Sequence, residues 1–289
     1  MSYELLQEIP FPEYAHSKLS DLFKQYSIIG GMPEVIAEYV NSKKVHTLKR
    51  IYRNLLTSYI DDVEKYGKND SQIKIIRHVI KSSFYEAGLR IKFHGFGNSN
   101  YKSRELSEAF KTLEKAFLLN LVYPVTSTEI PAVANFRRSP KLQLMDTGLI
   151  SFFANIQQEL LVNHEIGSVF SGRIAEHLVG QEIIALSNSV LFELKFWTRE
   201  IATANAEIDF IYQFKGMLIP IEVKYGATGR LRSLFQFIDK APHNYGVRIF
   251  SGKFSIENVK TLNGKSFKLL NLPFYLLNKL PEYLARLTK

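Results

Sequence analysis

The chain has 289 residues, of which 46% are hydrophobic and 22% charged, an ordinary composition for a globular protein with room for two or three small cores. It has no cysteine, which excludes disulfides and thiolate metal sites and is typical of a reducing cytoplasm. We expect a cytoplasmic location without membrane attachment, because the N-terminus lacks a basic segment followed by an apolar one and the longest apolar stretch, 116–125, is broken by Asn120 and Pro124. The net charge of +9 favours an anionic partner, most economically nucleic acid.

Residues 1–68 predict a helical segment. Apolar side chains recur at three- and four-residue steps over 19–26 and again over 45–59, which is the period of a helix with one buried face. Gly30, Gly31 and Pro33 separate the two stripes, so we expect the helices to be interrupted there.

Residues 69–150 predict a winged-helix-like module. Apolar stripes over 73–84 and 103–119 indicate helices, and short apolar runs at 121–125 and 141–145 indicate a strand pair whose loop, 126–140, would be the wing. Six basic side chains of the second helix and the loop are candidates for contact with DNA phosphates or base edges: Lys102, Arg104, Lys111, Lys115, Arg137 and Arg138. Glutamates dilute the basic face of this helix, and a structural or protein-binding role stays open.

Residues 151–289 predict an α/β domain with the order helix, three strands, helix, strand. The expected elements are a helix at 168–187, strands at 190–197, 206–214 and 217–224, a helix at 229–240 and a strand at 246–251, followed by a closing strand at 266–271 and a helix at 274–287. The expected fold class is therefore α+β with several domains.

The second and third of these strands carry a candidate metal site. A tight turn at Lys215 and Gly216 would make them a hairpin, with Asp209 on one strand and Glu222 and Lys224 on one face of the other. Two carboxylates that converge there would suit Mg²⁺ or Mn²⁺. The alternative is a solvated hairpin end, but the surrounding residues are strongly apolar, and buried carboxylates in a group indicate a function.

The ordered motifs resemble a known family. Glu176 on a helix, Asp209 on a strand and the E-x-K of Glu222 and Lys224 follow the order of the PD-(D/E)xK nuclease superfamily. The wider pattern resembles the C-terminal domain of unknown function of archaeal and bacterial AAA-type ATPases, in the segments GRIAEHLV (172–179), EIDFI (207–211), IPIEVK (219–224), GGMPEV (30–35), SYIDDV (58–63) and MDTGL (145–149).

The resemblance implies a C-terminal nuclease-like domain, similar to Holliday-junction resolvases. Glu176, Asp209, Glu222 and Lys224 would be catalytic, and Asp209, Glu222 and the Val223 carbonyl would hold the metal ion. The reaction would be hydrolysis of DNA phosphodiester bonds, with Lys224 orienting the attacking water or stabilising charge on the phosphate.

The relatives of this family resemble fusions with an N-terminal ATPase, of which this chain looks like the C-terminal portion. No G-x-x-x-x-G-K-[ST] segment occurs, so we expect no ATPase activity from the chain itself. An AAA-type ATPase domain or subunit is an expected partner. Two alternatives stay open: a non-catalytic DNA-binding or regulatory domain of such an ATPase, and a protein-interaction scaffold whose basic charge is incidental.

Overall fold

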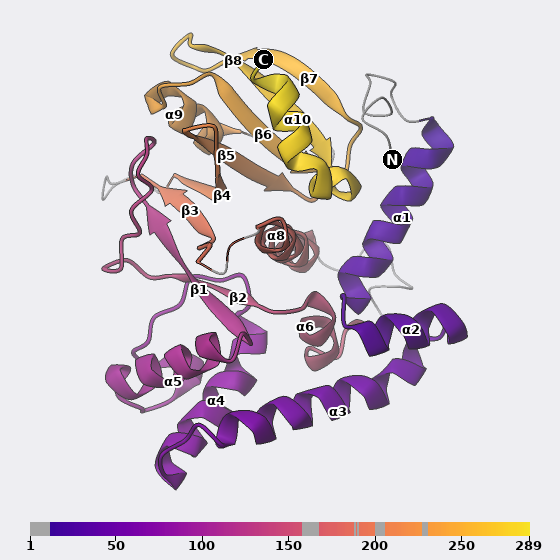
Figure 1. The fold of residues 1–289 in the computed structure, drawn as a ribbon, viewed down its shortest axis with the longest axis vertical. Coiled ribbons are helices and arrows are strands. Elements are labelled where there is room, and N and C mark those ends of the chain that lie inside the picture. The colour runs from indigo at the N-terminus through magenta and orange to yellow at the C-terminus, as the bar shows by residue number, and fades with distance from the viewer. Residues whose placement is uncertain (1–11, 158–167, 188, 190, 200–205, 227–230) are drawn as a thin grey trace. The chain divides into compact units, whose positions relative to one another are not determined.

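The computed structural model describes residues 12–157, 168–187, 189, 191–199, 206–226 and 231–289 (Figure 1). It is a mixed α+β structure that divides into two compact units. The helical unit comprises Gln25–Val125 and Ala134–Phe196, and the sheet unit comprises Met1–Lys24, Thr126–Val133 and Trp197–Lys289. These units are interleaved along the chain, whereas the expected domains 1–68, 69–150 and 151–289 follow one another.

The helical unit surrounds a short antiparallel strand pair. Its elements are α2 (Pro33–Ser42), α3 (Val45–Glu64), α4 (Asp70–Glu86), η2 (Phe96–Asn98), α5 (Ser103–Lys115), β1 (Leu119–Val125), β2 (Lys141–Leu144), α6 (Thr147–Phe153) and α8 (Ser168–Ala185). The register of β1 and β2 runs from Leu119↔Leu144 to Val122↔Lys141, which confirms the expected strand pair. Two elements, α1 (Glu13–Ile29) and β3 (Lys195–Thr198), are divided between the units.

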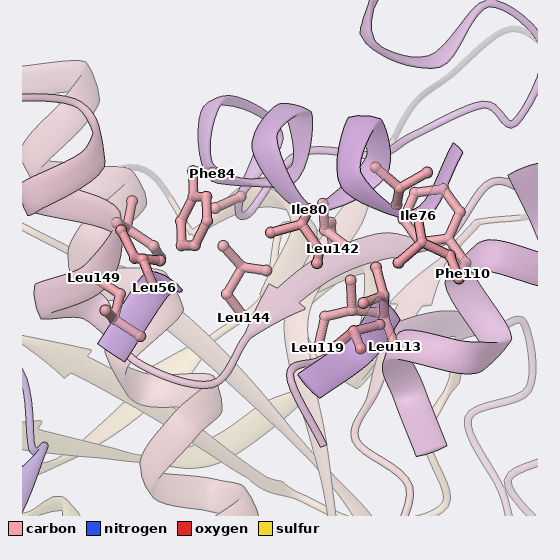
Figure 2. Close-up of a cluster of buried hydrophobic side chains, with 14 of the residues drawn as sticks. Leu56, Ile76, Ile80, Phe84, Phe110, Leu113, Leu119, Leu142, Leu144 and Leu149 are labelled. Carbon is pink, nitrogen blue, oxygen red and sulfur yellow. The ribbon is translucent and has the colours of Figure 1, made fainter. Parts of the chain in front are cut away.

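Apolar side chains from α3, α4, α5 and the strand pair form the core of this unit (Figure 2). Each fully buried side chain of this size contributes about 1.5–3 kcal/mol relative to exposure. The labelled members of the cluster are Leu56, Ile76, Ile80, Phe84, Phe110, Leu113, Leu119, Leu142, Leu144 and Leu149.

The buried carboxylate of Asp146 connects two of the segments that carry the family resemblance. Asp146 caps α6 by accepting the Leu149 N–H at 3.0 Å through Oδ1, and it accepts the Gly31 N–H at 2.7 Å through Oδ2. Burial raises the pKa of Asp146, although its backbone hydrogen bonds oppose the shift. The MDTG and GGMPE segments therefore meet at one junction, where Asp146 has the capping role that its position before Gly148 indicates.

The sheet unit contains β4 (Glu207–Phe214), β5 (Met217–Lys224), α9 (Arg232–Lys240), β6 (Tyr245–Phe250), β7 (Ser255–Lys260), β8 (Ser266–Pro273), η3 (Phe274–Lys279) and α10 (Leu280–Leu287). The strands lie in the order β4-β5-β6-β8-β7. The β5–β6 and β6–β8 pairs are parallel, and the β4–β5 and β7–β8 pairs are antiparallel. Helix α9 connects the parallel strands β5 and β6 and buries Leu234, Phe237 and Ile238. Figure 1 shows these strands beside α10, which is drawn in yellow.

Several elements differ from the expected ones, among them α2, which was not expected between the two predicted helical stripes. Strand β7 was not expected because its side chains are mostly exposed and polar, and α6 was not expected because it is short. Helix α5 ends at Lys115 rather than at residue 119, and Phe117 beyond it has a positive φ of 57°. Residues 190 and 229, the expected starts of a strand and a helix, lie outside the described residues, and the elements found there, β3 and α9, begin at Lys195 and Arg232.

The loop between β1 and β2 does not form a wing along its whole length. Residues 126–133 belong to the sheet unit, where the Thr126 carbonyl accepts the Trp197 indole N–H at 3.0 Å and the Thr128 hydroxyl donates to the Lys240 carbonyl at 3.3 Å. Only the part from Ala134 onward lies with the helical unit. The winged-helix-like assignment therefore stays a prediction that rests on α5 and the strand pair.

Candidate functional site

The hairpin of β4 and β5 has the turn that the sequence predicts. Lys215 and Gly216 both have positive φ, 45° and 74°, and form the two-residue turn between the strands. Such turns match the twist of the flanking strands, and glycine takes this conformation without steric cost. The register runs from Phe214↔Met217 at the turn to Phe210↔Ile221, which brings the next residues of both strands to the open end of the hairpin.

The Asp209 side chain joins the two strands at this open end. Its Oδ2 atom accepts the Val223 N–H at 2.7 Å. Alternate residues of an antiparallel strand donate to the facing strand, so Val223, two residues beyond the paired Ile221, points its N–H towards β4. The carboxylate thus takes the position of a backbone acceptor, and it lies beside the peptide that links Glu222 and Val223.

Glu222 and Lys224 project from the same face of β5 and form an ion pair. Lys224 Nζ lies 2.6 Å from Glu222 Oε1, and only 6% of Glu222 is exposed. A carboxylate removed from water requires a partner of opposite charge or hydrogen-bond donors. Lys224 supplies that partner, and its side chain stays 28% exposed at the rim of the site. The structure thus brings Asp209, Glu222 and Lys224 together, as the sequence predicts.

Polar residues of the neighbouring strands extend this face of the sheet. Glu222 pairs with Arg248 on β6, Arg248 pairs with Asn271 on β8, and Asn271 pairs with Ser255 on β7. Side chains opposite one another in adjacent strands project from the same face. Asn271 is fully buried and donates to Ser255 Oγ at 2.9 Å and to Glu257 Oε1 at 2.6 Å. Neither Arg248 nor Asn271 was among the residues predicted from the sequence.

Glu176 lies on α8 in the helical unit. Its Oε1 atom is 2.6 Å from Lys141 Nζ, and the Lys141 side chain is only 9% exposed. One turn earlier, the Arg173 guanidinium donates to the carbonyls of Tyr85 and Ala87, at 2.9 and 2.6 Å, and so satisfies the C-terminal end of α4. The GRIAEHLV segment therefore attaches α8 to the helical unit, and the convergence of Glu176 with the strand acids stays a prediction.

His177, next to Glu176, has a structural role. Its Nε2 atom accepts the Leu144 N–H of β2 at 3.0 Å, and the ring is buried. Burial lowers the pKa of His177 to about 4, and the charge of Arg173 acts in the same direction. The ring is neutral at neutral pH, as an acceptor for this hydrogen bond must be.

Within the described ranges, no three side chains of His, Cys, Asp or Glu lie together in a way that could hold a metal ion. The protein ligands at the hairpin end would therefore be the two carboxylates of Asp209 and Glu222, together with the Val223 carbonyl. Hard divalent cations take such oxygen ligands, and Mg²⁺ keeps several waters in its shell. The chemistry of this ligand set fits Mg²⁺ or Mn²⁺.

The residues predicted to contact DNA are all exposed on the helical unit: Lys102, Arg104, Lys111, Lys115, Arg137 and Arg138. Helix α5 buries Leu106, Ala109, Phe110 and Leu113 on its opposite face, which leaves the basic residues to solvent. Phe136, in the adjacent loop, is 69% exposed and packs edge-to-face on Tyr123. Its position differs from the burial that is usual for an aromatic side chain.

An open groove of about 390 Å³ runs along the basic side of α5. Lys68, Lys111 and Lys115 line it, opposed by the single carboxylate of Glu108. Arg104 approaches the same Glu108 at 3.3 Å on the exposed surface. The groove therefore has a basic lining, with Lys68 as a member that the sequence did not single out.

Two family models match the chain, and both describe domains of unknown function. DUF8612 matches residues 20–160, and DUF4143 matches residues 171–275. A search of curated proteins found no relative that matches the chain. The C-terminal region that contains Glu176, Asp209, Glu222 and Lys224 thus matches the DUF4143 model, whereas the segments at 30–35, 58–63 and 145–149 fall within the DUF8612 match. Among the described helices, none combines the length and apolar character needed to cross a bilayer.

Proposed function

We propose that the chain binds DNA and that the open end of the β4–β5 hairpin is a metal-dependent phosphodiesterase site. The observation that carries the proposal is the convergence of Asp209, Glu222 and Lys224, with Glu222 almost completely buried. A buried carboxylate beside a second acid and a lysine is the arrangement that functional sites favour over solvated hairpin ends. The PD-(D/E)xK resemblance supports the same reaction and assigns the third acidic role to Glu176.

A Mg²⁺ or Mn²⁺ ion held by Asp209, Glu222 and the Val223 carbonyl would activate water and stabilise charge on the phosphate. Asp209 can take this role while it accepts the Val223 N–H, because a carboxylate has about four lone-pair positions. Lys224 is held beside Glu222 by their ion pair, with its ammonium group at the rim. From that position it would donate a hydrogen bond to a phosphate oxygen or orient the attacking water.

The helical unit would contribute DNA affinity. The groove lined by Lys68, Lys111 and Lys115 offers three cations to a phosphate backbone. Phe136, in the loop before β2, is exposed enough to stack on an unpaired base. An AAA-type ATPase is the partner that the family resemblance suggests, since the chain itself lacks a phosphate-binding loop.

A second candidate function is a non-catalytic regulatory or DNA-binding domain. It is favoured by the structural use of both acids: Asp209 holds the two strands together, and Glu222 is neutralised by Lys224. In that case the acids serve folding or metal binding alone.

Cleavage of supercoiled plasmid with Mg²⁺ or Mn²⁺ tests the catalytic proposal. We expect the unmodified protein to nick the plasmid. The cleavage rate should fall about 10²–10³-fold in Lys224→Ala, as it does when a single donor to the transition state is removed from other enzymes. Asp209→Asn should be inactive. The asparagine keeps an acceptor for the Val223 N–H while removing the charge. Lys215→Ala, at the turn end of the same hairpin, is the matched control and should retain full activity.

Calorimetry with Mn²⁺ separates the two roles, because Lys224→Ala should leave metal binding largely intact and Asp209→Asn should weaken it. Equal cleavage by all variants would identify a contaminating nuclease. If linear, supercoiled, flapped and four-way DNA all stay intact, with and without an ATPase partner, the regulatory function is the correct one.

A further inference from the structure

Arg248 occupies the centre of the polar row on the sheet. It lies between Glu222 on β5 and Asn271 on β8, and the charge of Glu257 on β7 acts on it. Its side chain is partly buried, and its guanidinium carbon lies 4.3 Å from the centre of the Phe250 ring. Stacking on an aromatic face holds the planar guanidinium in a fixed orientation.

The hydrogen-bonding capacity of this arginine is not used up inside the protein. Among the described residues, the buried Nε–H of Arg248 and the buried Oδ1 of Asn271 have no hydrogen-bond partner. A buried donor without a partner costs about 1–3 kcal/mol. Guanidinium carries five donors in a fork that matches the oxygens of a phosphate or carboxylate. Because the Nε atom is itself buried, an oxyanion from solvent would meet the outer edge of this guanidinium, whose orientation the Phe250 ring fixes.

The neighbouring charges favour an oxyanion that approaches along this face. Lys224, two residues beyond Glu222, projects from the same face of β5, so Glu222 has a cation on its own strand and another on the adjacent one. A metal ion at Asp209 and Glu222 would cancel the acidic charge between these cations. The combined field would then be positive beside the site of the proposed hydrolysis.

We propose that Arg248 binds a phosphate group of the nucleic-acid strand and positions it beside the Asp209–Glu222–Lys224 site. This inference rests on the proposed function for the identity of the strand, and it extends the site by one strand of the sheet. Arg248 is a positioning residue, because it holds phosphate oxygens and takes no part in bond making.

Glu257 should act as a competitor for the guanidinium. It is exposed and accepts a hydrogen bond from Asn271, and its charge opposes the lowering of the pKa of Arg248 that burial causes. Glu257→Gln keeps an acceptor for Asn271 but removes the negative charge. Under the proposal this variant binds phosphate more tightly, whereas a structural ion-pair role for Arg248 gives no gain in binding.

The test measures binding rather than cleavage, first without divalent metal and then with Mg²⁺, which should strengthen binding because it would cancel the acidic charge of Asp209 and Glu222. A 5′-phosphorylated trinucleotide and inorganic phosphate are titrated into the ¹⁵N-labelled full chain while the Nε–H signal of Arg248 is followed by NMR. We expect this signal to shift on binding and the trinucleotide affinity to fall about tenfold or more in Arg248→Ala, with partial recovery in Arg248→Lys. Glu257→Gln should raise the affinity.

Lys268→Ala is the matched control. Lys268 is exposed on β8 and lies three residues from Asn271, so it projects from the opposite face of the sheet. Its replacement by alanine changes the net charge by the same amount as Arg248→Ala. Equal affinities for Arg248→Ala and Lys268→Ala, in samples that are equally folded by circular dichroism, would overturn the inference. If binding depends on Arg248 but the protein cleaves no DNA, the role of Arg248 is supported and the nuclease function is refuted. If the protein cleaves DNA but binding does not depend on Arg248, the nuclease function is supported and the role of Arg248 is refuted.

Discussion

Several ionisable residues that are buried or partly buried have hydrogen-bond or ion-pair partners of different kinds. Asp146 accepts backbone N–H groups at a helix start, Asp209 accepts one between two strands, and Glu222 is paired with a lysine. His177 is buried as a neutral acceptor. Each solution restricts the protonation state that the folded protein tolerates, so the stability of the fold depends on pH through particular residues.

We predict that His177 makes the helical unit less stable in acid. Its pKa is lowered from 6.5 to about 4 by burial, so protons bind the unfolded chain more readily, and stability is lost as pH falls from the unfolded value through the folded one. Between pH 7 and pH 5 this residue should remove about 2 kcal/mol of unfolding free energy.

Urea unfolding at the two pH values measures the effect in the unmodified protein and in His177→Gln. The glutamine variant should be less stable at pH 7 but should lose about 2 kcal/mol less on acidification. His46→Gln, at an exposed position on α3, is the control. The same pH dependence in all three proteins would contradict the assignment.

At the level of elements, apolar periodicity predicted the longer elements that have a buried face, but it missed the short buried helix α6. The strands β4 and β5 and the helix α8 match the expected ranges closely, because near-continuous apolar runs or a helical stripe mark them. Strand β7 escaped prediction because it is mostly exposed and polar, and its pairing with β8 is not encoded in a local pattern.

The same reasoning explains which site residues were predictable. Asp209, Glu222 and Lys224 are joined by one hairpin, so their spacing along the chain fixes their proximity. Arg248 and Asn271 reach the same face through parallel pairings that follow a helical crossover and a further strand. The register of these strands cannot be read from a short spacing in the sequence, so the row of Glu222, Arg248 and Asn271 is seen only in the folded sheet.

Two glycine substitutions should have effects of opposite sign. A Cβ at Gly148, at the start of α6, would overlap the Ile29 carbonyl, so Gly148→Ala should destabilise the protein by about 1–3 kcal/mol. A Cβ at Gly172, inside α8, meets nothing within 4 Å, so Gly172→Ala should stabilise it by about 0.4–1 kcal/mol. Chemical denaturation of both variants measures these changes. A neutral Gly148→Ala would show that the junction with Ile29 can relax.

At the level of the whole molecule, charge is the property that most constrains the partner. The net charge is +9, and the three lysines of the α5 groove gather part of it on one surface. Such a surface attracts the phosphate backbone of DNA whatever its base sequence. The DNA affinity of this surface should therefore depend more on salt concentration than on base sequence.

We predict salt-sensitive binding of duplex and branched DNA that depends on this groove. The slope of log affinity against log salt should lose about 0.9 for each phosphate contact removed, hence about 1.8 for the double variant Lys111→Ala with Lys115→Ala. Fluorescence anisotropy at several salt concentrations gives the slope. The double variant Lys260→Ala with Lys268→Ala changes the same charge on the sheet unit and should keep the original slope. No binding at low salt would remove nucleic acid as a partner.

The position of β7 has a consequence for association between copies of the chain. This strand ends the described sheet order, and it presents Glu257 and Lys260 to solvent beside the half-exposed Ile256. A bare strand edge invites another backbone to add to the sheet, and charged side chains of both signs oppose such growth. The polarity that made β7 hard to recognise is therefore also what protects the molecule from edge-to-edge aggregation.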